Sequence, residues 1–197
     1  MNVLVVALLI TSIFQYTNCA DEISQLQCGK SVGCFRLPAD CRTTSCNVFI
    51  TYAYKPSTDS FDISIFTKHK WAAFAQGKEL HKEIMTGMKG EACVEKNDIV
   101  QLVSLSATKN ELPDFKATTS AIFNPTGIKT KGGIICKYSR KTGVKDVKDF
   151  MTSLETKVYS IYAFGDNLQT NGYPAYHGAG HTGHTVEATD LKKVMLS

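Results

Sequence analysis

Histidine is the side chain of this 197-residue sequence whose spacing first indicates metal chemistry. Three of the five histidines, His177, His181 and His184, lie within eight residues of one another. Neutral imidazoles bind Zn²⁺ and Cu²⁺ well, and spacings of four and three would align on a helix. The intervening glycines instead indicate a loop. The segment is therefore either a copper or zinc site or a solvent-exposed His-rich loop.

Two methionines, Met85 and Met88, form a second candidate group. Their window, EIMTGMKGEAC, shows no regular apolar period, so we expect both side chains to be exposed rather than part of the core. A thioether is a soft ligand, and Met with His is one of the pairs that hold haem iron. Because the chain has no C-x-x-C-H motif, any haem would be bound non-covalently.

The sequence shows no motif of a familiar hydrolase or nucleotide-binding enzyme. It has no Gly-rich phosphate loop, no G-x-S-x-G and no H-E-x-x-H. We therefore assign no catalytic residue, leave open whether the chain is an enzyme, and favour an electron-transfer or ligand-binding role. The net charge is +4 and the basic residues are scattered, so nucleic acid is not an expected partner.

The first twenty residues resemble a signal peptide. Residues 3–14 form an apolar run of 12, which is too short to span a bilayer and suits a signal-peptide core. Cleavage after Cys19 or Ala20 would fit, and no later run approaches 18 apolar residues. We expect a secreted, extracellular protein without a membrane span, divided into a signal peptide (1–19), one domain (20–190) and a short tail (191–197).

Six cysteines remain after the expected cleavage: Cys28, Cys34, Cys41, Cys46, Cys93 and Cys136. An even number in a secreted chain predicts disulfides, here three, and six cysteines allow 15 pairings. The sequence has no C-x-x-C pair, which disfavours a structural zinc site. We prefer pairings that join Cys93 and Cys136 to the 28–46 cluster, because long loops constrain the unfolded chain most.

Alternating apolar residues dominate the rest of the chain and predict an antiparallel β-sandwich. The expected strands are 48–54, 61–66, 99–105, 134–139 and 158–164. Residues 78–88 and 147–154 could each hold a helical turn or two. Residues 170–183 contain four glycines and one proline, so we expect a loop there.

Several segments together resemble an extracellular DOMON domain. The resemblance begins with the four cysteines of residues 28–46 and spans about residues 28–186. The other segments that resemble the family are Trp71-Ala72-Ala73-Phe74, Met85 eight residues before Cys93-Val94, the run from Ile135 to Arg140, the run from Tyr159 to Gly165, and the run from Gly172 to His177.

The resemblance implies an immunoglobulin-like β-sandwich of about ten strands, stapled by disulfides, that can hold haem b at one end. By position, Met85 and His177 would be the axial ligands. The alternative ligands are Met88, His181 and His184. Trp71 and Tyr176 would lie beside the cofactor, although for Trp71 we favour the simpler interpretation of a buried aromatic of the sandwich core.

The function that follows from the resemblance is one-electron transfer by a secreted haem b domain. Iron held by both Met and His has no open position, which favours electron transfer over oxygen activation. The partner would be an extracellular or membrane redox protein, or a small reductant such as ascorbate. Two alternatives remain: a haem-free module that recognises a sugar or a protein, and a copper or zinc binder that uses the histidine loop.

Overall fold

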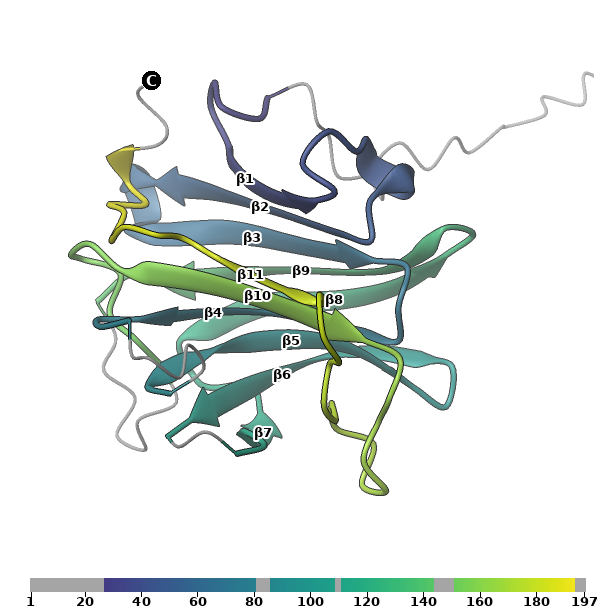
Figure 1. Cartoon of the computed structure of the whole chain (residues 1–197). Coiled ribbons are helices and arrows are strands. Elements are labelled where there is room, and N and C mark those ends of the chain that lie inside the picture. The colour runs from purple at the N-terminus through teal and green to yellow at the C-terminus, as the bar shows by residue number, and fades with distance from the viewer. Residues whose placement is uncertain (1–26, 81–85, 109–110, 144–150, 194–197) are drawn as a thin grey trace, which may run out of the picture.

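The protein is a two-layer β-sandwich (Figure 1). The computed structural model describes residues 27–80, 86–108, 111–143 and 151–193. One antiparallel sheet has five strands in the order β1-β2-β3-β9-β8, and the other has six in the order β11-β10-β4-β5-β6-β7. The five-stranded sheet comprises β1 (Gly33–Leu37), β2 (Val48–Lys55), β3 (Ser60–Thr67), β9 (Gly133–Lys141) and β8 (Ile122–Thr130). The six-stranded sheet comprises β11 (Thr182–His184), β10 (Tyr159–Gly165), β4 (Trp71–Gly77), β5 (Met88–Lys96), β6 (Ile99–Ala107) and β7 (Asp114–Ala117). The predicted all-β sandwich class is confirmed.

All five predicted strands are present, as β2, β3, β6, β9 and β10. The strands that the alternation did not predict are either short or lack a period of two. β4 is the clearest case, because all seven of its residues are buried. A strand buried on both faces has no polar face, so it leaves no alternating pattern to detect.

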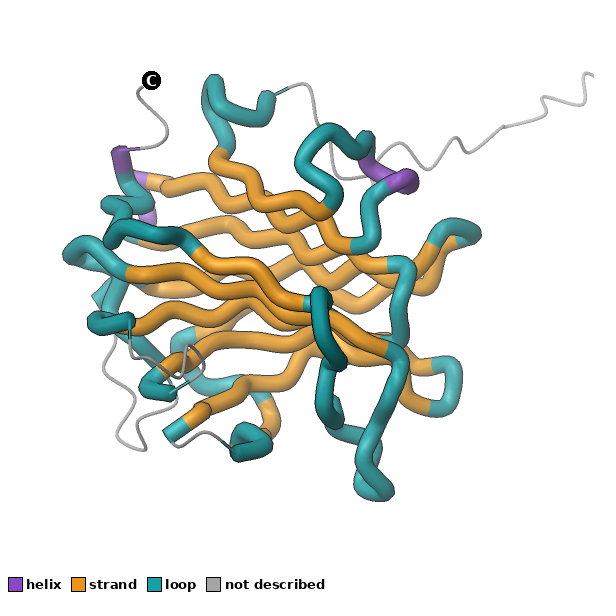
Figure 2. The backbone as a smooth tube through the Cα atoms, in the orientation of Figure 1, coloured by secondary structure: helices purple, strands orange, loops and turns teal. Residues whose placement is uncertain are grey.

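The expected helical turns are wrong where the structure describes them. Residues 78–80 and 86–87 are not helical, β5 already begins at Met88, and residues 151–154 are irregular. The rest of both segments lies outside the described residues. Two short 3₁₀ turns, Thr43–Ser45 and Pro56–Thr58, lie between strands, and strands dominate the described residues (Figure 2).

The main core lies between the two sheets. Ile50 and Ile63 from the five-stranded sheet pack in one cluster with Phe74 and Phe164 from the six-stranded sheet. All four side chains are at most 2% exposed. This core fixes which side of each strand faces inward, because a shift by one residue would turn the apolar set toward solvent.

A second apolar cluster, the outer cluster, covers the opposite face of the six-stranded sheet. It comprises Trp71, Ala73, Ala75, Met88, Ala92, Val94, Val103, Leu105, Ile161 and Ala163. Partly buried side chains such as Leu80, Phe115 and Tyr173 pack against it. The six-stranded sheet is therefore buried on both faces, with the second sheet on one side and loops on the other.

Three disulfides join the six cysteines, as expected, but in a different pairing: Cys28–Cys34, Cys41–Cys46 and Cys93–Cys136. The preference for long bonds into the N-terminal cluster is wrong. Cys93 on β5 and Cys136 on β9 both point into the sandwich, where their Cα atoms lie 5.5 Å apart, so they link the two sheets.

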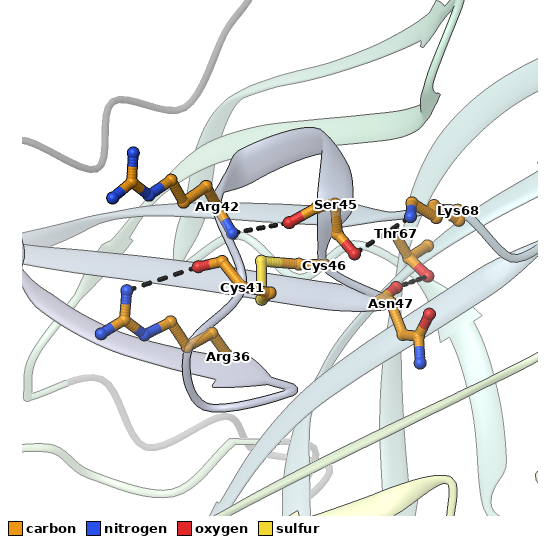
Figure 3. The surroundings of a disulfide bond; sticks show 8 residues. All are labelled: Arg36, Cys41, Arg42, Ser45, Cys46, Asn47, Thr67 and Lys68. Carbon is orange, nitrogen blue, oxygen red and sulfur yellow. Dashed lines mark hydrogen bonds between the residues drawn. A yellow bond between two sulfur atoms is a disulfide. The ribbon is translucent and has the colours of Figure 1, made fainter.

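The Cys41–Cys46 bond closes a tight loop beside β2 (Figure 3). Arg36 donates to the carbonyl of Cys41 at 3.5 Å, and Lys68 donates to the carbonyl of Ser45 at 3.0 Å. These contacts and the pairing of β1 with β2 attach the cysteine-rich segment to the five-stranded sheet.

The C-terminal segment belongs to the sandwich beyond residue 190. Leu191 is 2% exposed in the main core, and Lys192 contacts Asp59 at 3.2 Å. The predicted signal peptide lies outside the described residues. None of the described residues belongs to a helix long and apolar enough to cross a membrane.

Candidate functional site

A cavity of about 460 Å³ opens on the outer face of the six-stranded sheet. Its floor is formed by Trp71 and Ala73 of β4, Leu105 of β6 and Ala163 of β10, and Phe115 of β7 adds an aromatic ring. Two loops complete it, contributing Glu111, Leu112 and Pro113 after β6 and Pro174, Ala175, Tyr176 and His177 after β10. Its size and apolar lining are those of a small-molecule site.

Small side chains explain why this face is hollow. Ala73 and Ala163 are direct neighbours in the pairing of β4 with β10, and Ala73 also faces Ala92 on β5. Methyl groups on three adjacent strands leave a shallow, flat floor where larger residues would fill the space. These alanines were not predicted as site residues from the sequence, and the signal that could have indicated them is the set of alanines in β4 beside Trp71.

Trp71 faces this cavity. It is 3% exposed, and its indole N–H donates to the carbonyl of Asn167 at 2.9 Å. Gly165 lies opposite it in register, and a Cβ there would come within 3.2 Å of the indole ring. Trp71 is therefore a buried aromatic, and its side chain belongs to the outer cluster rather than to the main core between the sheets.

His177 lines the same cavity and has a defined orientation. Its Nδ1 lies 2.7 Å from the carbonyl oxygen of Gly178, so Nδ1 carries the proton and donates. Nε2 is then left with a lone pair, and metal-binding histidines are commonly oriented through such a bond by the other nitrogen. The ring of Tyr176 packs against His177 with centroids 4.8 Å apart.

The other two loop histidines have different surroundings. His181 stacks on Phe164 with ring centroids 4.8 Å apart and lies 5.6 Å from the ring of His69. His184 is exposed on β11. Neither lines the cavity, and the described part of the chain contains no group of three or more His, Cys, Asp or Glu side chains that could hold a metal ion.

The contact between His69 and Asp166 was not expected from the sequence. Nδ1 of His69 lies 2.8 Å from a carboxylate oxygen of Asp166, whose other oxygen accepts from the backbone N–H of Lys70 at 3.1 Å. The two residues are far apart in sequence, so no local spacing could have indicated the pair. It fixes the start of the loop that carries His177.

Of the two candidate methionines, the structure describes Met88. Met85 lies outside the described residues. Met88 is fully buried in the outer cluster, where its sulfur would lie 2.8 Å from a Cβ placed on Gly77. The expectation that Met88 is exposed is therefore wrong. It lies on the same face of the sheet as the cavity but is not one of the cavity's lining residues.

Behind the cavity floor, between the two sheets, a buried charged pair joins Glu91 of β5 to Arg140 of β9. Glu91 and Arg140 are both 0% exposed, and their carboxylate oxygen and guanidinium nitrogen lie 3.5 Å apart. Tyr138 donates to the same carboxylate at 3.0 Å. Burial raises the pKa of Glu91, and the charge of Arg140 and the Tyr138 bond oppose that rise. Burial also raises the pKa of Tyr138.

Arg140 makes two further contacts that tie this end of the sandwich together. Its guanidinium donates to the side-chain oxygen of Gln76 and to the carbonyl of Thr152, both at 2.5 Å. Gln76 Nε2, Glu91 Oε1 and Arg140 Nε are buried without a hydrogen-bond partner among the described residues. Such groups are usually satisfied by ordered water.

The side chains present suit a flat, apolar cofactor with a metal centre. The alanine floor offers space for a planar ring, Trp71 and Phe115 offer aromatic contact, and His177 offers one nitrogen ligand with its lone pair free. Haem meets these requirements, because its iron accepts imidazole as an axial ligand and its ring is largely apolar.

No family model matches the chain, and no curated protein matches it. Among solved structures, the chain is similar to the cytochrome b domain of pyranose dehydrogenase from Coprinopsis cinerea, with a TM-score of 0.51 and 13% sequence identity. The similarity covers 75% of this chain and 78% of that domain. At this identity the likeness is one of fold, and it is to the kind of domain that the sequence resemblance indicated.

Proposed function

We propose that the outer-face cavity binds haem b non-covalently and that the chain carries single electrons. The observation that supports this most is His177, an imidazole with a free Nε2 lone pair on the wall of an apolar cavity. The sandwich that supports the cavity is similar in fold to a cytochrome b domain.

Each residue has a defined role in this proposal. Nε2 of His177 would bind the iron, and the carbonyl of Gly178 orients the ring by accepting from Nδ1. Met85 is the proposed second ligand, with Met88 as the alternative because it belongs to the outer cluster. Trp71 and Tyr176 flank the cofactor, and the Asn167 carbonyl fixes the indole of Trp71.

Bound haem would supply a metal centre that gains and loses one electron. The chain's own contribution is to exclude water and to hold the ligands. An apolar lining and a thioether ligand both favour the reduced, less charged form, so they raise the reduction potential. With two protein ligands no coordination position is open, which favours electron transfer over reaction with oxygen.

We further propose that the protein is secreted and exchanges electrons with an extracellular or membrane redox partner. Three disulfides are compatible with an oxidising compartment, and the N-terminal segment resembles a signal peptide. Residues 20–190 and the adjoining Leu191 then form one haem-binding domain.

The test is the absorption spectrum of the secreted full chain, purified and then supplied with haemin. We expect a sharp Soret band and low-spin α and β bands on reduction. His177→Ala should lose haem or become high-spin, whereas His184→Ala is the matched control, because His184 is an exposed histidine on β11 that does not line the cavity. No Soret band after haemin addition would exclude the proposal.

The methionine assignment needs its own pair of variants. Met85→Ala should abolish the low-spin bands if Met85 is the second ligand, and Met88→Ala should do so if the alternative is correct. Spectra unchanged in both would show that neither methionine binds the iron.

A second candidate function is haem-free binding of a small molecule. It is favoured by the charge of the lining: none of the described residues that line the cavity is Lys or Arg, whereas Glu111 adds a carboxylate. Haem has two anionic propionates, which would have to extend out of such a cavity. A secreted protein that never takes up haemin but binds an uncharged ligand would support this second function.

A further inference from the structure

The rim of the cavity is unusually apolar and exposed. Leu112 is 54% exposed and Tyr176 is 66% exposed, and both line the cavity. Among the described residues only four large hydrophobic side chains are this exposed, and two of them meet at this opening. Single exposed apolar side chains scattered over a surface need no explanation. Exposed apolar side chains that gather at one opening indicate a binding surface.

The rim also has a charge of one sign. Glu111 is exposed next to Leu112, and the lining residues within the described ranges include no Lys or Arg. A carboxylate accepts hydrogen bonds from hydroxyl donors and repels anions. The rim therefore accepts a donor group and disfavours a negatively charged molecule.

Among the described lining residues, the polar side chains are too few to recognise a sugar. Besides Glu111, the lining offers the hydroxyl of Tyr176 and the imidazole of His177, while the Trp71 indole N–H is already bonded to Asn167. A polyhydroxylated ligand needs many converging donors and acceptors, since each buried unpaired hydroxyl costs binding free energy. The rim instead suits a ring with one or two hydroxyls.

We infer that this rim binds uncharged phenolic aromatics of the hydroquinone class. The aromatic ring packs against Tyr176 and Leu112, and a phenolic hydroxyl donates to the carboxylate of Glu111. Only the redox role of the bound hydroquinone rests on the proposed function, because the rim would then hold the small molecule that contacts the cofactor site. Ascorbate, an anion at neutral pH, is disfavoured as that molecule.

The experiment is isothermal titration calorimetry on the secreted full chain at low ionic strength, with hydroquinone and ascorbate as separate probes. We expect saturable binding of hydroquinone and none of ascorbate. Tyr176→Ala should weaken hydroquinone binding about fivefold, since an aromatic contact of this kind is worth about 1 kcal/mol. Val186→Ala is the matched control, because Val186 is 83% exposed and does not line the cavity.

The charge argument is tested by Glu111→Gln and Glu111→Lys. Loss of the carboxylate should weaken hydroquinone binding about threefold, as expected for one hydrogen bond. The lysine variant should gain measurable ascorbate binding. Equal affinity for hydroquinone in the parent and in Tyr176→Ala, or ascorbate binding by the parent, would overturn the inference.

Failure here can be told apart from failure of the proposed function by recording the Soret band of each sample. A Soret band without hydroquinone binding overturns only the assignment of the rim. Hydroquinone binding with no Soret band, even after haemin addition, leaves the rim assignment in place and overturns the haem proposal.

Discussion

The two faces of the six-stranded sheet are built in opposite ways. The inner face packs against the second sheet and is closed, yet it contributes Glu91 to a buried ion pair with Arg140 of that second sheet. The outer face carries only apolar side chains in its cluster, yet it is open at a cavity of about 460 Å³. Neighbouring residues of one strand, Ala72 and Ala73, belong to the two different faces.

The difference shows how one sheet can stabilise the fold through one face and bind a ligand on the other. The inner face has partners on a second sheet, so its contacts, its disulfide and its ion pair hold the sandwich together. The outer face is covered only by loops, so small side chains there leave space without loosening the core. Substitutions on the inner face should therefore change stability, and substitutions on the outer face should change binding.

The largest expected effect is on the inner face. Arg140→Met should destabilise the fold by about 3–5 kcal/mol, because it leaves Glu91 buried without its cation. The double variant Arg140→Met with Glu91→Leu should recover much of this loss, since apolar pairs often replace buried ion pairs at little cost. Urea unfolding of the three proteins measures the coupling, and equal losses in the single and double variants would contradict it.

The disulfide between the sheets should rank next. Replacing Cys93 and Cys136 with alanine should cost about 4 kcal/mol, the chain-entropy value for a loop of this length. The matched control is the pair Cys41 and Cys46, which are only 5 residues apart and should cost about 2 kcal/mol. Thermal melting of both variants measures the ratio of the two stability losses. A larger stability loss from removing the local bond would show that loop length does not govern the stabilisation.

A matched pair of alanines compares the faces directly. Ala72→Leu adds volume between the sheets, where Ala72 is 0% exposed, and should cost about 1–3 kcal/mol through overpacking. Ala73→Leu adds the same volume to the cavity and should cost less than about 1 kcal/mol while abolishing binding of haemin or hydroquinone. The comparison fails if Ala73→Leu is the more destabilising of the two.

The last expected effect is a pH dependence. Because burial raises the folded-state pKa of Glu91, stability should fall as pH rises from about 4.5 through that raised pKa, by at most about 1.4 kcal/mol per pH unit. Glu91→Gln should remove this slope. Asp59 acts in a lower window: the Thr142 hydrogen bond lowers its pKa to about 2, so its contribution is lost only as pH falls toward that value. Urea unfolding between pH 4.5 and 8 separates the two, and an unchanged slope in Glu91→Gln would exclude this role.

Much of the fold was predictable from local pattern. Val48, Ile50 and Tyr52 alternate with a second set of side chains because a strand presents successive residues to opposite faces. The six cysteines predicted three disulfides, and the structure confirms that number. β4 escaped prediction because both of its faces are buried.

The candidate site was predictable only in part. His177 was singled out and does line the cavity, whereas His181, four residues later, stacks on Phe164 instead. Their surroundings differ because the loop turns at its glycines, with Gly178 and Gly180 both at positive φ, a conformation that spacing does not reveal. The roles of His177 and Met85 in binding stay predictions.

The sequence by itself determined the β-rich class, the position of five strands, the number of disulfides and the candidate status of His177, because these depend on composition and local period. The tertiary structure decided the pairing of Cys93 with Cys136, the burial of Met88 and the outward direction of Trp71. Each of these depends on which segments meet across a sheet or between sheets. Such meetings join residues far apart in the chain, so no local pattern records them.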